Sequence, residues 1–222
     1  MARINKIYKD IYLITQKLSE LSLLKVNNFP IINGNLLIWR NYKWISYELK
    51  KEDYKYIYDL IIENENYNFI LLDGWIIQMM YKFSWNWKNI ESHRLTYYPN
   101  INTIQLWEDP EEYEERIYWM RMFWDLIYKD NVSTPIRFDF NLNDPSFKEY
   151  DHSYSHLTFW WYKNCRITVS SPLTPFQFIL FIIKSFYYEK YIEYKVDSLF
   201  LDTLLFDESI TKNEKNKLYI KL

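Results

Sequence analysis

The chain has 222 residues but only two glycines, and their positions constrain the fold more than any other feature. Each follows a turn-forming residue between two apolar runs, Asn33-Gly34 in IINGNLLIW and Asp73-Gly74 in ILLDGWIIQ. Such pairs are strong β-hairpin signals, and a type I′ turn needs positive φ at both central residues. We therefore expect a hairpin at each pair, with a type I′ turn at Asn33-Gly34. Because the chain has no third glycine, it cannot form the glycine-rich loops that cradle phosphates or dinucleotides.

Alternating apolar and polar residues extend these hairpins into a longer sheet. The expected strands cover residues 68–72, 75–83, 90–98, 101–107, 136–140, 156–162 and 165–169, with turns at Pro99-Asn100 and Lys163-Asn164. The C-terminal run LYIKL is expected to be a short edge strand.

Apolar residues at helical spacing predict four helices. They are expected over residues 4–24, 51–64, 109–130 and 174–193. The last two have clear start signals, since Asp109 and Thr174 suit the N-cap and each is followed by a proline. Glu112 and Gln177 then stand at the capping-box positions of these two helices. Helices before, between and after the hairpins indicate an α+β fold: a mostly antiparallel sheet, an N-terminal helical segment and helices packed on the sheet.

The length suits a single domain over residues 1–222. Within it we expect a helical and hairpin N-terminal part over 1–66, a core of sheet and helices over 67–195, and a C-terminal tail over 196–222.

Charge and cysteine content narrow the class of protein. The net charge is −2, and no cluster of Lys and Arg supports tight nonspecific binding to nucleic acid. The composition does not exclude a local groove that binds nucleic acid. The single cysteine, Cys165, excludes an internal disulfide and fits a reducing cytoplasm. The most apolar run, residues 176–183, is far shorter than the ~20 residues of a membrane span. We expect a soluble, cytoplasmic protein with no membrane attachment.

The strand IRFDF carries the first candidate site residues. Its period of two places Ile136 and Phe138 on one face, and Arg137 and Asp139 on the other. A guanidinium binds phosphate or carboxylate bidentately, and a carboxylate can orient a histidine. Arg137 and Asp139 are therefore candidate catalytic residues. The alternative is a solvent-facing pair of opposite charges with no chemical role.

Two of the three histidines, His152 and His156, lie four residues apart in DHSYSH. On a helix this spacing lets two imidazoles bind one metal. The flanking residues predict a loop followed by a strand, and in an extended segment the two Cα atoms lie about 13 Å apart unless the loop curls. We therefore expect no metal site and no cofactor. An acid/base role needs only that His156 and Arg137 face a shared cleft. A hydrogen-bonded sheet histidine without chemistry is the competing interpretation.

The turn at Lys163-Asn164 decides which face carries His156. A two-residue turn places His156 on an apolar face with Trp160 and Cys165, and a three-residue turn flips the faces. Both alternatives stay open. Cys165 has no activating base nearby and is expected to be a small core residue. Trp160 and its neighbour cannot both be core, so Trp160 is a candidate ligand contact.

Three further candidates for ligand binding lie in the meander. His93 and Arg94 are neighbours on one strand and point to opposite faces, so at most one of them joins any given site. Gln78 is a lone amide in an apolar run, and a buried amide needs a hydrogen-bond partner. It belongs either to a polar network or to the surface.

Six blocks occur in this order along the chain: DGWIIQMMYKF, SHRLTYYP, RFDF, HSYSHLTF, CRITVSSPLTPFQFILFIIKSFY and ITKNEK. Together they resemble a prokaryotic family of uncharacterised proteins, domain of unknown function 2290, most specifically over residues 137–187. The chain matches the family's pattern at Asp73, Gly74, Gln78, Tyr81, Phe83, His93, Arg94, Arg137, Asp139, His152, His156, Pro172 and Pro175. It departs at Phe159 and Trp160, where many members carry a glycine.

The family name supplies no reaction, and two functions compete. An Arg-x-Asp pair followed by a histidine-rich loop is similar to the layout of small toxins paired with antitoxins. This favours a component of a bacterial antiviral-defence or toxin–antitoxin system, with an effector that acts on nucleic acid or a nucleotide through Arg137, Asp139, His152 and His156. The alternative is a noncatalytic adaptor, antitoxin or sensor subunit that binds a protein encoded in the same operon. The high aromatic content, 21%, favours this alternative.

Overall fold

A computed structural model describes residues 3–43, 53–100, 134–159, 165–196 and 205–221. The helices in these ranges are α1 (Arg3–Glu20), α2 (Tyr54–Glu63), α5 (Pro175–Phe186), α6 (Tyr188–Glu193) and the 3-10 helix η3 (Glu214–Asn216). The strands are β1 (Leu24–Asn27), β2 (Pro30–Asn33), β3 (Leu36–Trp39), β4 (Phe69–Leu71), β5 (Ile76–Phe83), β6 (Ile90–Tyr98), β7 (Ile136–Asn141), β8 (Ser155–Phe159), β9 (Arg166–Val169) and β10 (Tyr219–Ile220). The expected strand over 101–107, the helix over 109–130 and the turn at Lys163-Asn164 lie outside the described residues.

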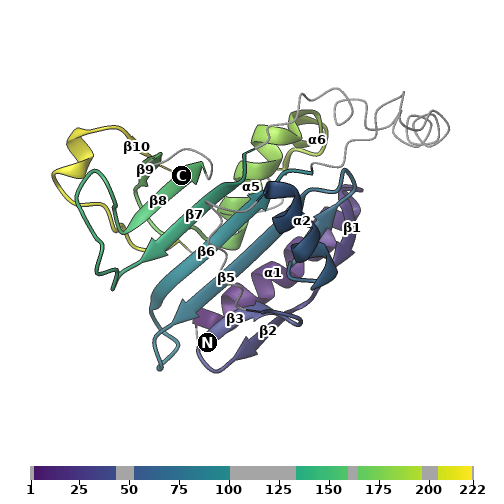
Figure 1. The fold of residues 1–222 in the computed structure, drawn as a ribbon, viewed down its shortest axis with the longest axis horizontal. Helices are drawn as coiled ribbons and strands as arrows, with labels where there is room; N and C mark the ends of the chain where they lie inside the picture. The colour runs from purple at the N-terminus through teal and green to yellow at the C-terminus, as the bar shows by residue number, and fades with distance from the viewer. Residues whose placement is uncertain (1–2, 44–52, 101–133, 160–164, 197–204, 222) are drawn as a thin grey trace.

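The strands form a single ten-stranded sheet within the described part of the chain. Its main path runs β1-β4-β5-β6-β7-β8-β9-β10 (Figure 1). Off this path, β3 pairs with β5, and β2 pairs with β3. Neighbouring strands are antiparallel, except that the edge strand β10 runs parallel to β9. The α+β prediction is confirmed, and so is the edge strand in LYIKL.

Both glycine pairs mark hairpins, but neither forms the simple turn that the dipeptide suggests. In the first hairpin Asn33 pairs with Leu36, so the two central residues are Gly34 and Asn35. Gly34 has φ +60°, and neither asparagine has positive φ. Positive φ at the first central position alone is the requirement of a type II′ turn. The predicted type I′ turn centred on Asn33-Gly34 is therefore wrong by one residue.

The second hairpin, β4–β5, has a three-residue loop. The Leu71 N–H donates to the Trp75 carbonyl at 2.8 Å, and the Gly74 N–H donates to the Leu71 carbonyl at 2.9 Å. Gly74 has φ +84°, as expected for the left-handed residue that ends a three-residue hairpin loop. A Cβ at this glycine would lie 2.5 Å from Nδ2 of Asn100. Gly74 is thus required both by its backbone conformation and by close packing.

The first helix is shorter than its apolar periodicity predicts. α1 ends at Glu20, and Ser22 adopts φ +54°. The Leu23 N–H then reaches back to the Leu18 carbonyl at 2.9 Å, as in a helix end closed by a left-handed residue. Glycine is the usual residue at such a position, so a serine there gave no stop signal. The strand β1, which begins at Leu24, was missed for the same reason.

The final helix is also interrupted. The capping box predicted at Thr174 and Gln177 is present at the start of α5. The expected single helix over 174–193 is nevertheless two helices, because Tyr187 leaves helical geometry with φ −132° and ψ 47°. Its hydroxyl donates to Oδ2 of Asp73 at 2.8 Å, which ties this break to the β4–β5 hairpin. None of the helices in the described ranges is long and apolar enough to cross a membrane.

The two faces of the sheet have different coverings. On one face alternate residues such as Tyr81, Leu95 and Phe138 are fully buried in the core that α1 and α5 complete. On the other face α2 packs over Ile76 and Tyr98. Figure 1 looks onto this second face, with α2 in front of the sheet and α1 and α5 behind it. Beyond α2 this face carries polar side chains, and the candidate site lies among them.

Candidate functional site

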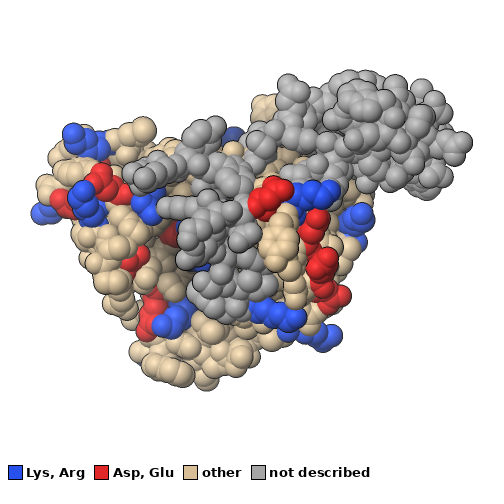
Figure 2. Space-filling model, in the orientation of Figure 1, with Lys and Arg blue, Asp and Glu red and all other residues tan. Residues whose placement is uncertain are grey.

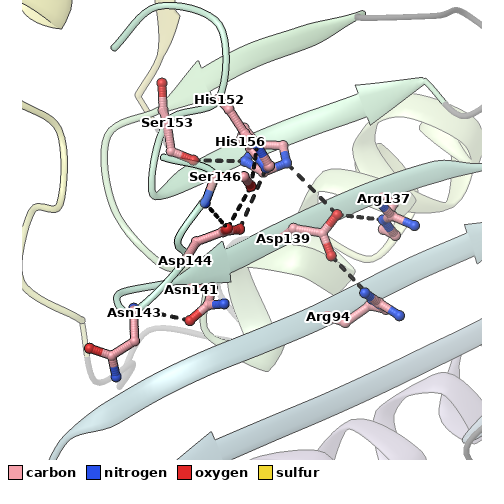
Figure 3. Close-up of polar contacts among 10 residues, drawn as sticks. All are labelled: Arg94, Arg137, Asp139, Asn141, Asn143, Asp144, Ser146, His152, Ser153 and His156. Atoms are coloured by element: carbon pink, nitrogen blue, oxygen red, sulfur yellow. Dashed lines mark hydrogen bonds and ion pairs between the residues drawn. The ribbon is translucent and has the colours of Figure 1, made fainter. Parts of the chain in front are cut away.

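Strand pairing brings three of the candidate polar residues into one line across the sheet. Arg94 on β6 lies opposite Asp139 on β7, and Asp139 lies opposite His156 on β8. Directly opposed residues on antiparallel strands have Cβ atoms about 5 Å apart on the same face. We call Arg94, Asp139 and His156 the catalytic row, for the role proposed for them below (Figure 3).

Asp139 is held by two arginines. Its Oδ1 accepts from Nε of Arg94 at 3.2 Å, and its Oδ2 accepts from Nε of Arg137 at 2.5 Å. Burial alone would raise the pKa of Asp139, but the charges of Arg137 and Arg94 outweigh it and lower the pKa to about 2. The carboxylate is therefore ionised at every physiological pH. Arg94 was considered only as a ligand contact from sequence, and the structure places it in direct contact with Asp139.

His156 lies on the same face as Asp139. β8 and β9 pair His156 with Thr168 and Leu157 with Ile167, which places His156 on the polar face of the sheet, away from the apolar one. The side chain is nevertheless buried, with 6% exposed. Its Nδ1 donates to the Ser153 carbonyl at 2.8 Å, and its Nε2 lies 3.9 Å from Oδ2 of Asp139. Burial lowers the pKa of His156, only partly offset by the charge of Asp139, so the imidazole is mainly neutral at pH 7.

His152 reaches the catalytic row because the loop between β7 and β8 curls back on itself. Lys148 and His152 form an isolated antiparallel bridge, and the rings of Phe147 and Tyr154 stack with centroids 4.0 Å apart. The rings of His152 and His156 then lie edge to face, 4.9 Å between centroids. The extended geometry expected from the sequence does not hold for this segment. The structure thus brings together Arg137, Asp139, His152 and His156.

Two residues of this loop were not identified from the sequence. Oγ of Ser146 lies 2.8 Å from Nδ1 of His152 and also donates to Oδ1 of Asp144 at 2.6 Å. The second oxygen of Asp144 lies 3.6 Å from Nε2 of His152. Asp144 also accepts from the Ser146 N–H at 2.8 Å. The Asp-Pro-Ser sequence is a recognisable turn signal, but nothing in it indicated that the turn would hold a histidine.

The other candidates for ligand binding, His93, Gln78 and Trp160, are not among the residues that the structure brings together at the site. His93 is on the core face, where its Nε2 accepts from the Leu173 N–H at 3.0 Å. As expected from strand alternation, only one of His93 and Arg94 joins the site. Gln78 is buried and donates to the Asn66 carbonyl at 2.5 Å, so it belongs to a polar network. Trp160 lies outside the described residues.

The geometry at the row suits the activation of a water or hydroxyl group. The unprotonated Nε2 of His156 and Oδ2 of Asp139 are both acceptors, 3.9 Å apart. One water can donate a proton to each at the ~2.8 Å typical of O–H donors. In Figure 3 the outer nitrogens of Arg94 and Arg137 point away from Asp139, and Arg94 is 45% exposed. These cationic groups lie where they can contact a phosphate next to that water.

On the face that carries the candidate site, the described residues present charges of both signs (Figure 2). Figure 2 shows this face of the molecule, and its Lys and Arg side chains are interspersed with Asp and Glu. Recognition of an anion would therefore depend on the local arginines rather than on a basic surface. Within the described ranges no group of three or more His, Cys, Asp or Glu side chains could hold a metal ion.

Comparison with known proteins gave a single kind of match. The model of a family described as "Uncharacterized conserved protein (DUF2290)" matches residues 23–222. No curated protein and no solved structure matches the chain.

Proposed function

The chain belongs to the DUF2290 family of uncharacterized conserved proteins, and from the site described above we propose that it is an effector enzyme that hydrolyses phosphodiesters of nucleic acid or nucleotides. The observation that carries the proposal is the catalytic row, where a buried neutral histidine faces a carboxylate fixed by two arginines. Perturbed histidines and carboxylates that converge beside cationic groups are typical of hydrolytic sites.

Each residue has a distinct role in the proposed reaction. Nε2 of His156 takes a proton from the attacking water while Oδ2 of Asp139 accepts the other hydrogen and orients the molecule. The water oxygen bonds to phosphorus, and the bond from phosphorus to the leaving oxygen breaks. His152 gives a proton to that leaving oxygen. Arg94 and Arg137 bind the phosphoryl oxygens, where negative charge accumulates. The chemistry requires no metal.

The biological setting is part of the proposal. The Arg-x-Asp pair and the histidine-rich loop are similar to the layout of small toxins, which supports a role in bacterial antiviral defence or in a toxin–antitoxin system. Cys165 is a free thiol, in keeping with action in the cytoplasm. A protein partner encoded in the same operon would hold such an effector inactive until it is needed.

The test compares His156→Gln, Arg137→Ala and their combination with the wild type, both in cells and with purified protein. Lys25→Ala, which removes an exposed cation from the remote strand β1, serves as a control for net charge. Loss of a general base is expected to reduce cleavage of a labelled single-stranded oligonucleotide by a factor of about 10²–10⁴. Toxicity or phage protection should fall in parallel. A double variant that keeps wild-type toxicity or phage protection would refute the proposal.

A second function is supported by the tip of the β5–β6 hairpin. Trp85 is 80% exposed there, within a loop closed by a hydrogen bond of 2.8 Å from the Ser84 N–H to the Asn89 carbonyl. Asn86 accepts from the Lys88 N–H at 3.1 Å, and Trp87 takes φ +58°. A rigid loop that presents a large aromatic is suited to anchor a protein partner. In this case the chain would be an adaptor, antitoxin or sensor subunit.

The two functions make different predictions for Trp85→Ala. If the protein acts through a partner, the substitution releases a protein that otherwise co-purifies from cells expressing the native operon, and His156→Gln does not. If the protein is the effector, His156→Gln abolishes the cellular effect and leaves any complex intact.

A further inference from the structure

A second line of polar side chains crosses the sheet next to the catalytic row. Thr96 on β6 lies opposite Arg137 on β7, Arg137 lies opposite Thr158 on β8, and Thr158 lies opposite Arg166 on β9. We call these four residues the threonine–arginine row. The row lies two residues along each strand from the catalytic row. Residues two apart on a strand share a face and are about 6.8 Å apart. Arg137 connects the two rows, because its Nε binds Asp139.

The threonine hydroxyls of this row are buried at an energetic cost. Thr96 is 0% exposed, and among the described residues Oγ1 of Thr96 and Oγ1 of Thr158 are buried without a hydrogen-bond partner. An unsatisfied buried hydroxyl costs roughly 1–3 kcal/mol. The other buried threonines of the described residues, Thr15, Thr168 and Thr174, all form side-chain hydrogen bonds; Thr15, for example, donates to the Ile11 carbonyl at 3.1 Å. The need for a β-branched residue in a strand does not explain the two hydroxyls, because valine meets that need without the cost.

The two threonines occupy the positions on either side of Arg137 in the sheet. Neighbouring strands are about 4.8 Å apart, so Thr96 and Thr158 flank Arg137 at adjacent positions, and Arg166 follows one strand further on. The row contains two cations and no carboxylate. Hydroxyl and guanidinium donors at adjacent positions on one face of a sheet match the acceptor oxygens of a phosphate.

We infer that the threonine–arginine row binds a phosphate adjacent to the one that is cleaved, so that the substrate is a single-stranded nucleic acid. The inference rests on the proposed phosphodiester hydrolysis at the catalytic row. Consecutive phosphates of an extended strand can lie on the two rows at once, with Arg137 between them. A mononucleotide has no second phosphodiester to place there. The hydroxyls of Thr96 and Thr158 would then find their partners in substrate oxygens.

The test uses Thr96→Val and Thr158→Val, which remove a hydroxyl and keep the branched shape. Thr15→Val is the matched control, since it removes a hydrogen-bonded buried hydroxyl far from the site. The full-length protein is titrated with a fluorescent single-stranded oligonucleotide, with a mononucleotide and with inorganic phosphate. Thermal unfolding is measured for each variant without ligand.

The expected results have opposite signs for stability and binding. Without ligand, the two row variants unfold at the wild-type temperature or above it, because an unsatisfied hydroxyl has been removed. Each should bind the oligonucleotide about tenfold more weakly, which is the loss of one hydrogen bond to a charged acceptor. Thr15→Val should lose stability and keep wild-type affinity. A merely structural role for Thr96 and Thr158 cannot give this pattern.

Two outcomes would overturn the inference. The first is wild-type oligonucleotide affinity in both row variants. The second is a wild-type protein that binds inorganic phosphate or the mononucleotide as tightly as the oligonucleotide, since one phosphate then accounts for all of the binding. Neither outcome bears on the cleavage reaction, which is measured separately with His156→Gln. If the wild type binds the oligonucleotide through the row but does not cleave it, the proposed function fails and the binding site stands.

Discussion

Protonation of His93 should weaken the attachment of the β9–α5 connection to the sheet. Nε2 of His93 accepts from the Leu173 N–H at 3.0 Å, and the Tyr81 hydroxyl donates to the Leu173 carbonyl at 3.1 Å. The two side chains thus hold both backbone groups of one residue immediately before α5. An imidazolium has a proton on both nitrogens, so it cannot accept the Leu173 N–H. Acidification therefore breaks one half of this attachment.

The magnitude follows from the pKa of the buried ring. Burial is the main cause that lowers the pKa of His93 to about 4, from 6.5 in the unfolded chain. As the pH falls below 6.5 the unfolded chain takes up this proton first, so the stabilisation is complete above 6.5 and is lost down to about pH 4. A shift of this size corresponds to a loss of about 3 kcal/mol between pH 7 and pH 4.

The assay is urea unfolding of the wild type and of His93→Gln at pH 7 and pH 4, followed by tryptophan fluorescence. Glutamine can keep an acceptor oxygen for Leu173 but does not titrate, so it removes the pH dependence of this site alone. The pKa of Asp139 is about 2, so that carboxylate remains ionised throughout the range. The wild type should lose about 3 kcal/mol more than the variant on acidification. Parallel losses in the two proteins, with equal urea dependence, would refute the argument.

Three further predictions concern stability. Gly74→Ala should destabilise the protein by about 2–3 kcal/mol, because φ is positive there and the new Cβ meets the Asn100 side chain. Gly34→Ala also has a positive φ but open space around it, so it should cost only about 1 kcal/mol. Chemical denaturation of the two variants tests the difference. Asp139→Asn should cost about 2 kcal/mol at pH 7, in line with the pKa of about 2, and a loss within 0.5 kcal/mol of zero would contradict the two-arginine clamp. Tyr187→Phe removes a buried hydroxyl that bonds two groups and should cost about 1–3 kcal/mol, measured as a lower unfolding midpoint in urea.

The fold class was predictable because the local signals were strong and agreed with one another. The glycine pairs marked two hairpins, and the Thr174–Gln177 capping box marked the start of α5. The errors are at positions where a residue adopts a conformation that its type does not indicate. Ser22 closes α1 in a left-handed conformation, and Tyr187 leaves the helix while its hydroxyl binds a distant hairpin. Such choices depend on tertiary contacts that a local pattern does not contain.

The candidate site was predictable in its residues but not in its geometry. Strand alternation correctly paired Arg137 with Asp139 on one face and separated His93 from Arg94. Alternation does not give the register between strands, so the ion pair of Arg94 with Asp139 was not foreseen.

The curled β7–β8 loop was the other part of the geometry that local sequence could not give. It depends on the stacking of Phe147 on Tyr154 and on the bridge between Lys148 and His152. Both contacts form only when the loop folds back on itself, and no periodic pattern reports such contacts.

The contrast between His93 and His156 shows that register, rather than residue type, decides which histidine could serve as the base in the proposed reaction. Both are buried, and burial lowers the pKa of each, so both are neutral at pH 7. The Nε2 lone pair of His93 already accepts a backbone N–H, and using it as a base would break that bond. The Nε2 of His156 instead faces the carboxylate of Asp139, which is also a hydrogen-bond acceptor, so the pair can bind a donor such as water. A shift of one residue in β6 would exchange the faces of His93 and Arg94, and would remove from Asp139 one of the two cations that keep it ionised.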